Sequence, residues 1–264
     1  MNFFRRNATP SLAFFTFHKC GSQWVRDVIN SKEVSEHTGL KFDNREINLN
    51  IHSWPIQKSR TLLGPIYNCG YDDWIRNKRK GQKALVVLRD PRDRMISWIY
   101  SVLYSHVNEP YSQYIRNKFS QYDDKEKIKL ANVLALTEFS GIAAKYGSWF
   151  GVREDKNLYV TTYEKLLNDS VGEFSKILDK LSFSVPIESL KKAVDLLSFE
   201  ARSGRQRGDE NINSHYRSGI GGGWKTKFYQ EDCDIWKAVF QNILTSGGWE
   251  SDENWGVSSS EINR

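Results

Sequence analysis

Short apolar runs alternate along this chain with longer stretches in which apolar side chains recur at helical spacing. The clearest run, Ala84–Leu88, is continuous and contains two valines, as is typical of a central parallel strand. Further strands are predicted at 11–17, which is rich in aromatic residues, and at 158–161. A short strand is also predicted at 62–67, where Gly64-Pro65 is expected to break it.

Helical patterns lie between these runs. After the first strand, apolar side chains within residues 24–29 share one helical face. Asp90 before Pro91 combines an N-cap residue with a proline at the first helical position, so a helix is expected from there through Leu103. Residues 31–60 are polar and irregular and are expected to form a loop. Further helices are predicted at 71–79, twice within 111–147 on either side of the charged stretch 123–129, and at 163–181, 187–199 and 231–244.

This alternation predicts an α/β fold in which a central parallel β-sheet is flanked by helices on both faces. The chain has 264 residues, of which 39% are hydrophobic, and this is enough for one sizeable core. No internal repeat or clear boundary interrupts the pattern. We therefore expect a single domain over residues 1–264, with its core at about 11–255.

The stretch 11–30 is the first candidate site, because it predicts a strand, a tight turn and a helix in direct succession. Such a P-loop-like unit directs backbone N–H groups and the positive end of the helix dipole at one spot, which favours a phosphate or a sulfate. Gly21 allows close approach of the backbone, Ser22 can cap the helix or donate to an anion, and Lys19 adds a positive charge. An ordinary strand–turn–helix unit with an incidental lysine is the alternative. The lysine precedes the glycine, so the turn is not a Walker A loop.

Two more stretches are suited to anions. Arg89 follows the predicted central strand, at the edge where open α/β sheets bind ligands, and Ser97 lies eight residues further on. Residues 203–225 interleave glycines with Arg217, Trp224 and Lys225, which suits a positively charged loop that folds over a phosphate. The alternatives are a charged turn for the first stretch and a flexible linker for the second.

Charge and cysteine content narrow the class of protein. Lysine and arginine exceed aspartate and glutamate by 38 to 32, a net charge of +6 that suits an acidic ligand without requiring nucleic acid. Cys20, Cys69 and Cys233 have no metal-binding spacing and are expected to be reduced thiols of a cytoplasmic protein. Residues 3–6, Phe-Phe-Arg-Arg, do not resemble a signal peptide, and no apolar run is long enough to span a membrane.

Taken together, three motifs resemble those of the sulfotransferases that use 3′-phosphoadenosine 5′-phosphosulfate (PAPS). Residues 17–24, Phe-His-Lys-Cys-Gly-Ser-Gln-Trp, are similar to the family's 5′-phosphosulfate loop, aromatic-x-Lys-Ser-Gly-Thr-Thr-Trp. Residues 89–93, Arg-Asp-Pro-Arg-Asp, followed by Ser97, match the 3′-phosphate motif at every characteristic position. Residues 217–225 resemble the late motif Arg-Lys-Gly-x-x-Gly-Asp-Trp-Lys, with Ser218 in place of lysine and Gly223 in place of aspartate. The resemblance extends from residue 11 to about 255 and implies the sulfotransferase fold.

The resemblance also implies a set of residues for PAPS and for its product, adenosine 3′,5′-bisphosphate (PAP). Lys19 and the backbone of the first motif would bind the 5′ end, Arg89, Ser97 and Arg217 would bind the 3′-phosphate, and Tyr163 would lie near the adenine. The full cofactor set is Lys19, Cys20, Gly21, Ser22, Gln23, Trp24, Arg89, Ser97, Tyr163, Ser198, Phe199, Arg217, Ser218 and Gly219.

The implied reaction is in-line transfer of a sulfuryl group to a hydroxyl or an amine of a small-molecule acceptor. Lys19 would neutralise the charge that develops on the leaving 5′-phosphate. The family's Lys-Thr-His segment, which supplies a catalytic histidine, has no counterpart near Leu63–Tyr67. Two general bases are therefore open: Asp27, which could instead be a helix-surface aspartate paired with Arg26, and His52 in the predicted loop.

Two other functions compete with this interpretation. A small-molecule or nucleoside kinase shares the fold and an anion loop, but would need a Walker A lysine and carboxylates for magnesium. A non-enzymatic nucleic-acid-binding protein would fit the basic charge, but here acidic residues are interspersed among the basic ones. We expect no nucleic-acid partner, no membrane association and no bound metal, and the oligomeric state stays open.

Overall fold

A computed structural model describes residues 11–106, 109–152 and 155–257. The chain divides into two compact units, the first formed by Met1–Leu88 and Val152–Ser198, the second by Arg89–Gly151 and Phe199–Arg264. Each unit is described below by itself, and the prediction of a single domain stays a prediction. The interpretation of residues 3–6 lies outside the described residues. Within the described part of the chain, no helix is both long enough and apolar enough to cross a bilayer.

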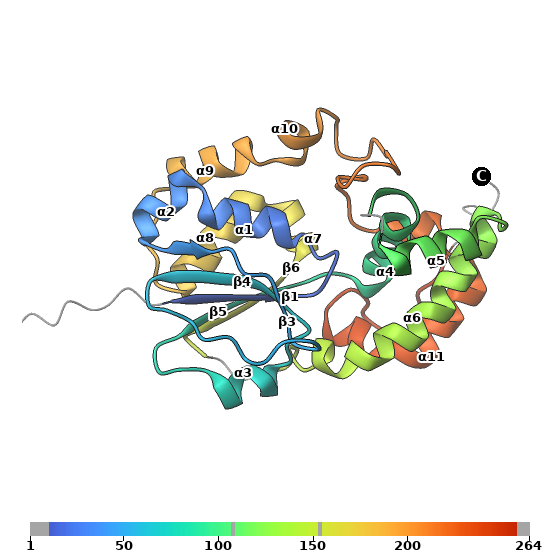
Figure 1. The fold of residues 1–264 in the computed structure, drawn as a ribbon, viewed down its shortest axis with the longest axis horizontal. Coiled ribbons are helices and arrows are strands. Elements are labelled where there is room, and N and C mark those ends of the chain that lie inside the picture. The colour runs from blue at the N-terminus through green and yellow to red at the C-terminus, as the bar shows by residue number, and fades with distance from the viewer. Residues whose placement is uncertain (1–10, 107–108, 153–154, 258–264) are drawn as a thin grey trace, which may run out of the picture. The chain divides into compact units, whose positions relative to one another are not determined.

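The first unit contains a parallel sheet (Figure 1). Its strand order is β2-β4-β1-β5-β6, the short β3 pairs with β4 as well, and every pairing is parallel. The predicted central parallel sheet is therefore confirmed. The strands are β1 (Leu12–Thr16), β2 (Lys41–Asp43), β3 (Ile47–Asn48), β4 (Thr61–Tyr67), β5 (Lys83–Leu88) and β6 (Leu158–Thr162).

Helices cover this sheet on both faces. In Figure 1, α1, α2, α8 and α9 lie on one side of it and α3 lies on the other. Alternate residues of β1 and β5, such as Phe14 and Val87, pack with Val25 and Val28 of α1 in one buried apolar cluster. The helices of this unit are α1 (Ser22–Asn30), α2 (Lys32–Thr38), α3 (Tyr71–Asn77), α7 (Tyr163–Asn168), α8 (Ser170–Lys180) and α9 (Ile187–Leu196).

The second unit is helical and its core is largely aromatic. Phe139, Trp236 and Phe240 pack with ring centroids 4.8–6.0 Å apart. The indole of Trp236 donates to the buried Asn132 at 2.7 Å, so its polar edge is satisfied. The elements are α4 (Pro91–Tyr100), the π-helix η1 (Ser101–Ser105), α5 (Pro110–Phe119), α6 (Asp124–Gly147), α10 (Phe199–Ser203), the 3₁₀-helix η2 (Gly223–Thr226) and α11 (Gln230–Ser246).

Several local predictions were wrong. The predicted loop at 31–60 contains α2, which ends at Gly39 in the left-handed conformation, and the short edge strands β2 and β3. Gly64-Pro65 does not break β4, because the strand continues through a cis peptide with an irregular register against β1. Two helices, α5 and α6, are found where two were predicted within 111–147, but the charged stretch 123–129 begins α6 and does not separate the two. The predicted helix 163–181 is two helices, because the Asp169 side chain caps a new helix there.

Candidate cofactor site

Residues 17–24, here called the anion loop, connect the carboxyl end of β1 to α1 in the first unit. The chain turns sharply, since Cys20 N–H donates to the Phe17 carbonyl at 3.3 Å and Lys19 and Gly21 both have left-handed backbones, with φ of 70° and 77°. Gly21 is the N-cap of α1, and among the described residues no side chain caps this helix. The first N–H groups of an α-helix have no partner within it, so those of Ser22, Gln23 and Trp24 form an anion-binding position.

Tyr163 packs directly against this loop. A Cβ on Gly21 would lie 2.7 Å from the Tyr163 ring, a distance that no real Cβ tolerates. Tyr163 begins α7, after the Thr162 side chain caps it, and its ring also meets Trp24 edge-on at 6.2 Å between centroids. The structure therefore brings together Gly21, Trp24 and Tyr163, three residues that the sequence assigned to one cofactor from distant positions.

A polar network borders the loop on its other side. The Tyr67 hydroxyl is hydrogen-bonded to Ser22 Oγ at 3.0 Å, and it is also hydrogen-bonded to the Glu46 side chain. The His18 ring stacks on the Tyr67 ring at 4.0 Å, with 13° between the planes. Tyr67 is 3% exposed, and this burial raises the pKa of its hydroxyl well above the ordinary value of a tyrosine. Tyr67 is therefore neutral and acts as a hydrogen-bonding group.

The two predicted bases have different surroundings. Asp27 forms an ion pair with Arg26 at 2.8 Å, the arrangement that the sequence offered as the alternative to a catalytic role. His52 is exposed, and its Nδ1 accepts a hydrogen bond from Asn48 N–H at 3.1 Å. Asn48 closes β3, so His52 follows the carboxyl end of a strand, as Lys19 does. Both base assignments stay predictions.

The second unit holds the Arg-Asp-Pro-Arg-Asp motif. Arg89 is 7% exposed, its backbone N–H donates to the Tyr146 hydroxyl at 2.8 Å, and its guanidinium donates to the Ile220 carbonyl at 3.1 Å. Asp90 caps α4 by accepting from the Arg92 N–H at 2.9 Å, as predicted. Ser97 lies half-buried on the same helix. The motif therefore starts a helix and holds Arg89 beside the glycine–arginine segment, residues 203–225.

Arg92 is a structural member of this motif. Its side chain is 1% exposed, and it forms ion pairs with Asp90 at 2.6 Å and with Glu250 at 2.5 Å. The guanidinium also lies over the rings of Trp224 and Trp255, at 3.8 and 4.5 Å from their centroids. Arg92 is thus fully engaged in packing within the second unit.

Asp93 fixes the glycine–arginine segment to the start of α4. Its carboxylate accepts from Gly222 N–H at 2.6 Å and from Trp224 N–H at 2.9 Å. Burial raises the pKa of this carboxyl, although the Arg89 charge and the two N–H groups oppose the rise. The sequence did not identify this role. Its signal was the second aspartate of the motif, but its partners lie more than 120 residues away.

Arg217 is held by an acidic residue of the same segment. Its guanidinium forms an ion pair with Glu210 and lies 5.0 Å from the centroid of the Tyr100 ring. Glu210 also pairs with Lys227 at 3.6 Å, so one carboxylate bridges two cations. The Nε of Arg217 is buried and has no hydrogen-bond partner among the described residues. This orphaned donor fits an anionic ligand.

The remaining predicted cofactor residues lie at the start of the second unit, next to it in the chain, or in the glycine–arginine segment. Ser218 is 6% exposed, and its carbonyl accepts from Gly208 N–H at 2.8 Å. Gly219 is left-handed, and a Cβ there would lie 2.5 Å from the ring of Phe199, which is the first residue of the second unit. Ser198 ends the first unit. Phe199, Ser218 and Gly219 are therefore close to one another within the second unit.

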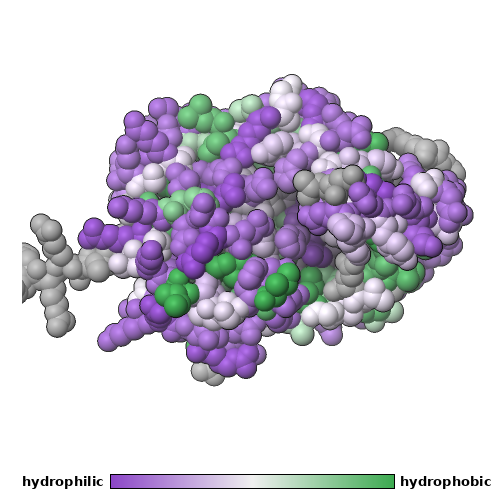
Figure 2. Space-filling view, in the orientation of Figure 1, coloured by the Kyte–Doolittle hydropathy of each residue, from purple (hydrophilic) through white to green (hydrophobic). Residues whose placement is uncertain are grey.

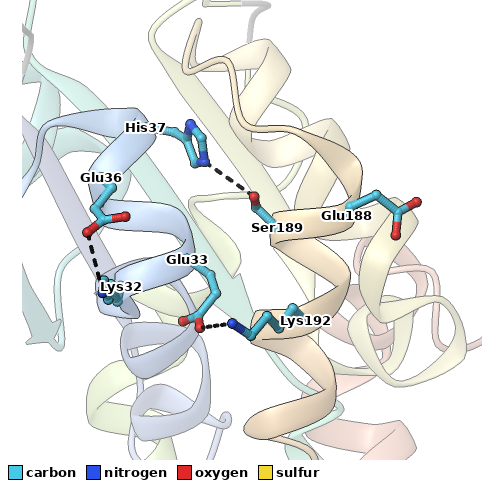
Figure 3. Close-up of a pocket in the computed structure, with 7 residues that line it drawn as sticks. All are labelled: Lys32, Glu33, Glu36, His37, Glu188, Ser189 and Lys192. Carbon is cyan, nitrogen blue, oxygen red and sulfur yellow. Dashed lines mark hydrogen bonds and ion pairs between the residues drawn. The ribbon is translucent and has the colours of Figure 1, made fainter.

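A surface pocket of about 430 Å³ lies between α2 and α9 (Figure 3). The close-up shows two ion pairs, Glu33 with Lys192 at 3.2 Å and Lys32 with Glu36 at 4.0 Å, while His37 bonds Ser189 and Glu188 points away from them. None of the predicted cofactor residues lines it. Since three glutamates and only two lysines line it, the pocket provides no anion site.

Comparison with known proteins gives three findings. A family model described as "Sulfotransferase domain" matches residues 75–248 and thus begins after the anion loop. The mouse (Mus musculus) protein named Sulfotransferase 2A2 is 26% identical over 177 residues, covering 61% of this chain and 56% of the relative. The chain thus spans about half the length of the curated relatives it matches.

Two solved structures are similar in fold. The crystal structure of mouse sulfotransferase SULT7A1 complexed with PAP matches with a TM-score of 0.56 and 15% identity, covering 89% of this chain and 84% of that one. Retinol dehydratase in a complex with retinol and PAP matches with a TM-score of 0.55 and 14% identity, covering 90% and 82%. At this identity the likeness shows the fold.

Proposed function

This chain belongs to the sulfotransferase domain family, and from that premise we propose that it is an enzyme that transfers a sulfuryl group from PAPS to a hydroxyl or an amine of a small molecule, with PAP as the other product. The observation that carries the proposal is the anion loop, in which left-handed Lys19 and Gly21 turn the chain into the N-terminus of α1. The two solved structures of similar fold are complexes with PAP. Family membership gives the kinase and nucleic-acid alternatives no support.

The residues of the first unit fit the 5′ end of the cofactor. Backbone N–H groups at the start of α1 present donors to a phosphate or a sulfonate, and Gly21 leaves the space that Tyr163 and a ligand need. Bound PAPS would supply an activated sulfuryl group joined to a phosphate leaving group. Lys19 would stabilise the negative charge that develops on that phosphate, a contribution of electrostatics and positioning.

We assign the 3′-phosphate to residues of the second unit. Arg89 and Arg217 supply the positive charge, Ser97 supplies a hydroxyl, and the orphaned Nε of Arg217 is a donor prepared for an anion. Phe199 packs on Gly219 beside them and offers an aromatic edge for the nucleoside. The substitution of Gly223 for the aspartate of the family motif is offset by Asp93, which anchors the same turn.

For the acceptor we propose an apolar alcohol or phenol. Retinol dehydratase, one of the two similar solved structures, binds retinol, an apolar alcohol. In this chain the segment after β3 exposes Ile51 at 77% and Ile56 at 71%, side chains that would gain from contact with an apolar molecule. Elsewhere the visible surface is mostly hydrophilic, with hydrophobic side chains in small separate groups (Figure 2). We propose a cytoplasmic enzyme, in line with the expected reduced thiols.

The test is calorimetric titration of the full chain with PAP, with AMP as the ligand that lacks the 3′-phosphate. We expect PAP to bind at least tenfold more tightly than AMP, and Arg89→Ala to abolish this preference. Lys19→Ala should still bind PAP but lose turnover of PAPS. Equal binding of PAP and AMP, or unchanged turnover in Lys19→Ala, would contradict the proposal, and ATP with magnesium would then be tried.

A further inference from the structure

Three oxygen-bearing side chains form a continuous hydrogen-bonded chain at the anion loop. Ser22 is the first residue of α1, Tyr67 ends β4, and Glu46 immediately precedes β3. The Tyr67 hydroxyl bonds both Ser22 Oγ, at 3.0 Å, and the Glu46 carboxylate. The pairing of Asn48 with Tyr67 holds β3 against β4, so Glu46 is kept near the Tyr67 side chain by the sheet.

The donor and acceptor properties of these groups allow hydrogen bonding along Ser22, Tyr67 and Glu46 to run in either of two directions. An ionised carboxylate can only accept, so with Glu46 ionised the Tyr67 proton points to Glu46 and Ser22 donates to Tyr67. With Glu46 protonated, Glu46 donates to Tyr67, Tyr67 donates to Ser22, and the Ser22 proton is released toward the N-terminus of α1. The 3.0 Å distance between the Tyr67 hydroxyl and Ser22 Oγ fits either direction. The protonation of Glu46 therefore decides whether Ser22 can donate to an anion in the loop.

We propose that Glu46 is the general base of the transfer and that Tyr67 is the positioning residue that couples its protonation to Ser22. This rests on the proposed function. The acceptor O–H proton moves to Glu46 as the acceptor oxygen forms its bond to sulfur. The bond between sulfur and the 5′-phosphate oxygen breaks, and its electron pair stays on that oxygen. Ser22 then donates a hydrogen bond, without transferring its proton, to the leaving phosphate, and Glu46 later releases its proton to water.

The surroundings suit Glu46 better than the two bases expected from the sequence. Glu46 is exposed, so an acceptor can reach it, whereas Asp27 is tied to Arg26 at 2.8 Å. His52 bonds the backbone of Asn48 through Nδ1, which leaves only Nε2 for an acceptor. The other titratable groups around Tyr67 are His18, whose ring stacks on it, and Cys20. His18 stacking restricts the Tyr67 ring and thereby keeps the relay aligned.

The test is a double-mutant cycle on PAP affinity, read by calorimetry at pH 7. Glu46→Gln removes the ionised carboxylate and introduces an amide N–H that can donate to Tyr67. This favours the hydrogen-bond direction that frees the Ser22 proton, so PAP should bind about fivefold more tightly. In a Tyr67→Phe background the same substitution should have no effect, since the relay is cut. A simple loss of negative charge would tighten binding equally in both backgrounds and would overturn the proposal.

The role of Glu46 as general base is tested by measuring turnover. PAP formation from PAPS is followed with 2-naphthol present, so that transfer to the phenol or to water is counted. Glu46→Gln should lower kcat about 100-fold with the KM for PAPS unchanged or lower. His52→Ala and Asp27→Asn should each lower kcat less than Glu46→Gln does. Normal kcat in Glu46→Gln overturns the base role and leaves the proposed function standing. Failure of the wild type to bind PAP would overturn both the base role and the proposed function.

Discussion

The two proposed anion-binding regions of this protein use different chemical groups. The anion loop of the first unit presents backbone N–H groups at the start of α1, shaped by two left-handed residues. The second unit presents the guanidinium groups of Arg89 and Arg217, and these already contact a carbonyl and a carboxylate, respectively. The backbone donors of the first region depend on its conformation, while the second region depends on which side chains compete for its cations.

This difference affects how each region responds to change. A backbone N–H is present at almost any residue, so the backbone donors of the anion loop should be lost only when its turn cannot form. A guanidinium that is paired with a carboxylate must exchange that partner for a ligand, so affinity in the second unit reflects a difference between two ion pairs. Four substitutions separate the two behaviours, in descending order of expected effect.

Gly21→Ala should have the largest effect. The new Cβ would lie 2.7 Å from the Tyr163 ring at a φ of 77°, so the turn must open. We expect PAP affinity to fall more than 100-fold and the free energy of unfolding to fall by about 2–3 kcal/mol. Gly81→Ala is the matched control, because Gly81 has the same φ of 77° with nothing within 4 Å of its Cβ position. If both variants behave alike in calorimetry and in thermal unfolding, crowding by Tyr163 has no role.

Asp93→Asn should weaken PAP binding about tenfold. The amide oxygen can accept from Gly222 or Trp224, but without the charge that now holds both N–H groups. The segment that carries Arg217 would then be held less firmly. Titration of PAP and AMP in parallel measures this, and an unchanged PAP affinity would show that the anchor does not matter for binding.

The same variant gives a pH test of stability. Burial raises the pKa of Asp93, so the folded protein binds this proton more tightly than the unfolded chain does. The stabilisation by the proton is present at low pH and is lost as the pH rises through the raised pKa. The wild type should therefore gain stability relative to Asp93→Asn as the pH falls from 7 to about 4, in urea unfolding. The opposite trend would refute the raised pKa.

Glu210→Gln should tighten PAP binding about three- to fivefold. The carboxylate that bridges Arg217 and Lys227 would no longer compete with a phosphate for these cations. The matched control is Glu200→Gln, which removes a carboxylate of the same unit whose partner is Arg207, at 3.5 Å. Calorimetry at two salt concentrations distinguishes a specific competitor from a general loss of negative charge, for which both variants would gain equally.

Cys20→Ser should have the smallest effect, less than twofold on PAP affinity. The Cys20 side chain is buried, and the turn uses its backbone N–H, which the serine retains. A larger change in affinity would show that side-chain identity matters in the anion loop and would remove the contrast with the second unit.

Much of the fold followed from the sequence, because its signals were local. The apolar run of β5 and the Asp90-Pro91 start of α4 need only neighbouring residues to be recognised. The helix start at Asp123 also had a local signal, a capping box with Glu126, but the density of charges concealed it. The edge strands β2 and β3 are two or three residues long and form only against β4, so no local pattern marks them.

The sequence predicted the motifs of the candidate site but not the residues that contact them in the fold. The order of Lys19, Arg89 and Arg217 along the chain identified the residues proposed to meet the cofactor. Their neighbours Glu46, Glu210 and Asp93 were missed as site residues. Glu46 is hydrogen-bonded to Tyr67, which lies on another part of the chain. Asp93 accepts a hydrogen bond from Gly222, 129 positions further along the chain. Such contacts depend on tertiary packing, which single-sequence patterns do not contain.

The left-handed backbone of Lys19 carries a consequence for evolution. A non-glycine residue at a φ of 70° strains the chain by about 1 kcal/mol or more, and glycine or asparagine would relieve it. Stability alone therefore selects against lysine at this position, and the charge that the proposed reaction needs would favour keeping it. In a descendant that had lost the proposed transfer reaction, this codon should be among the first to change toward glycine or asparagine. The residue at this position would then distinguish a descendant that retains the proposed activity from one that retains only the fold.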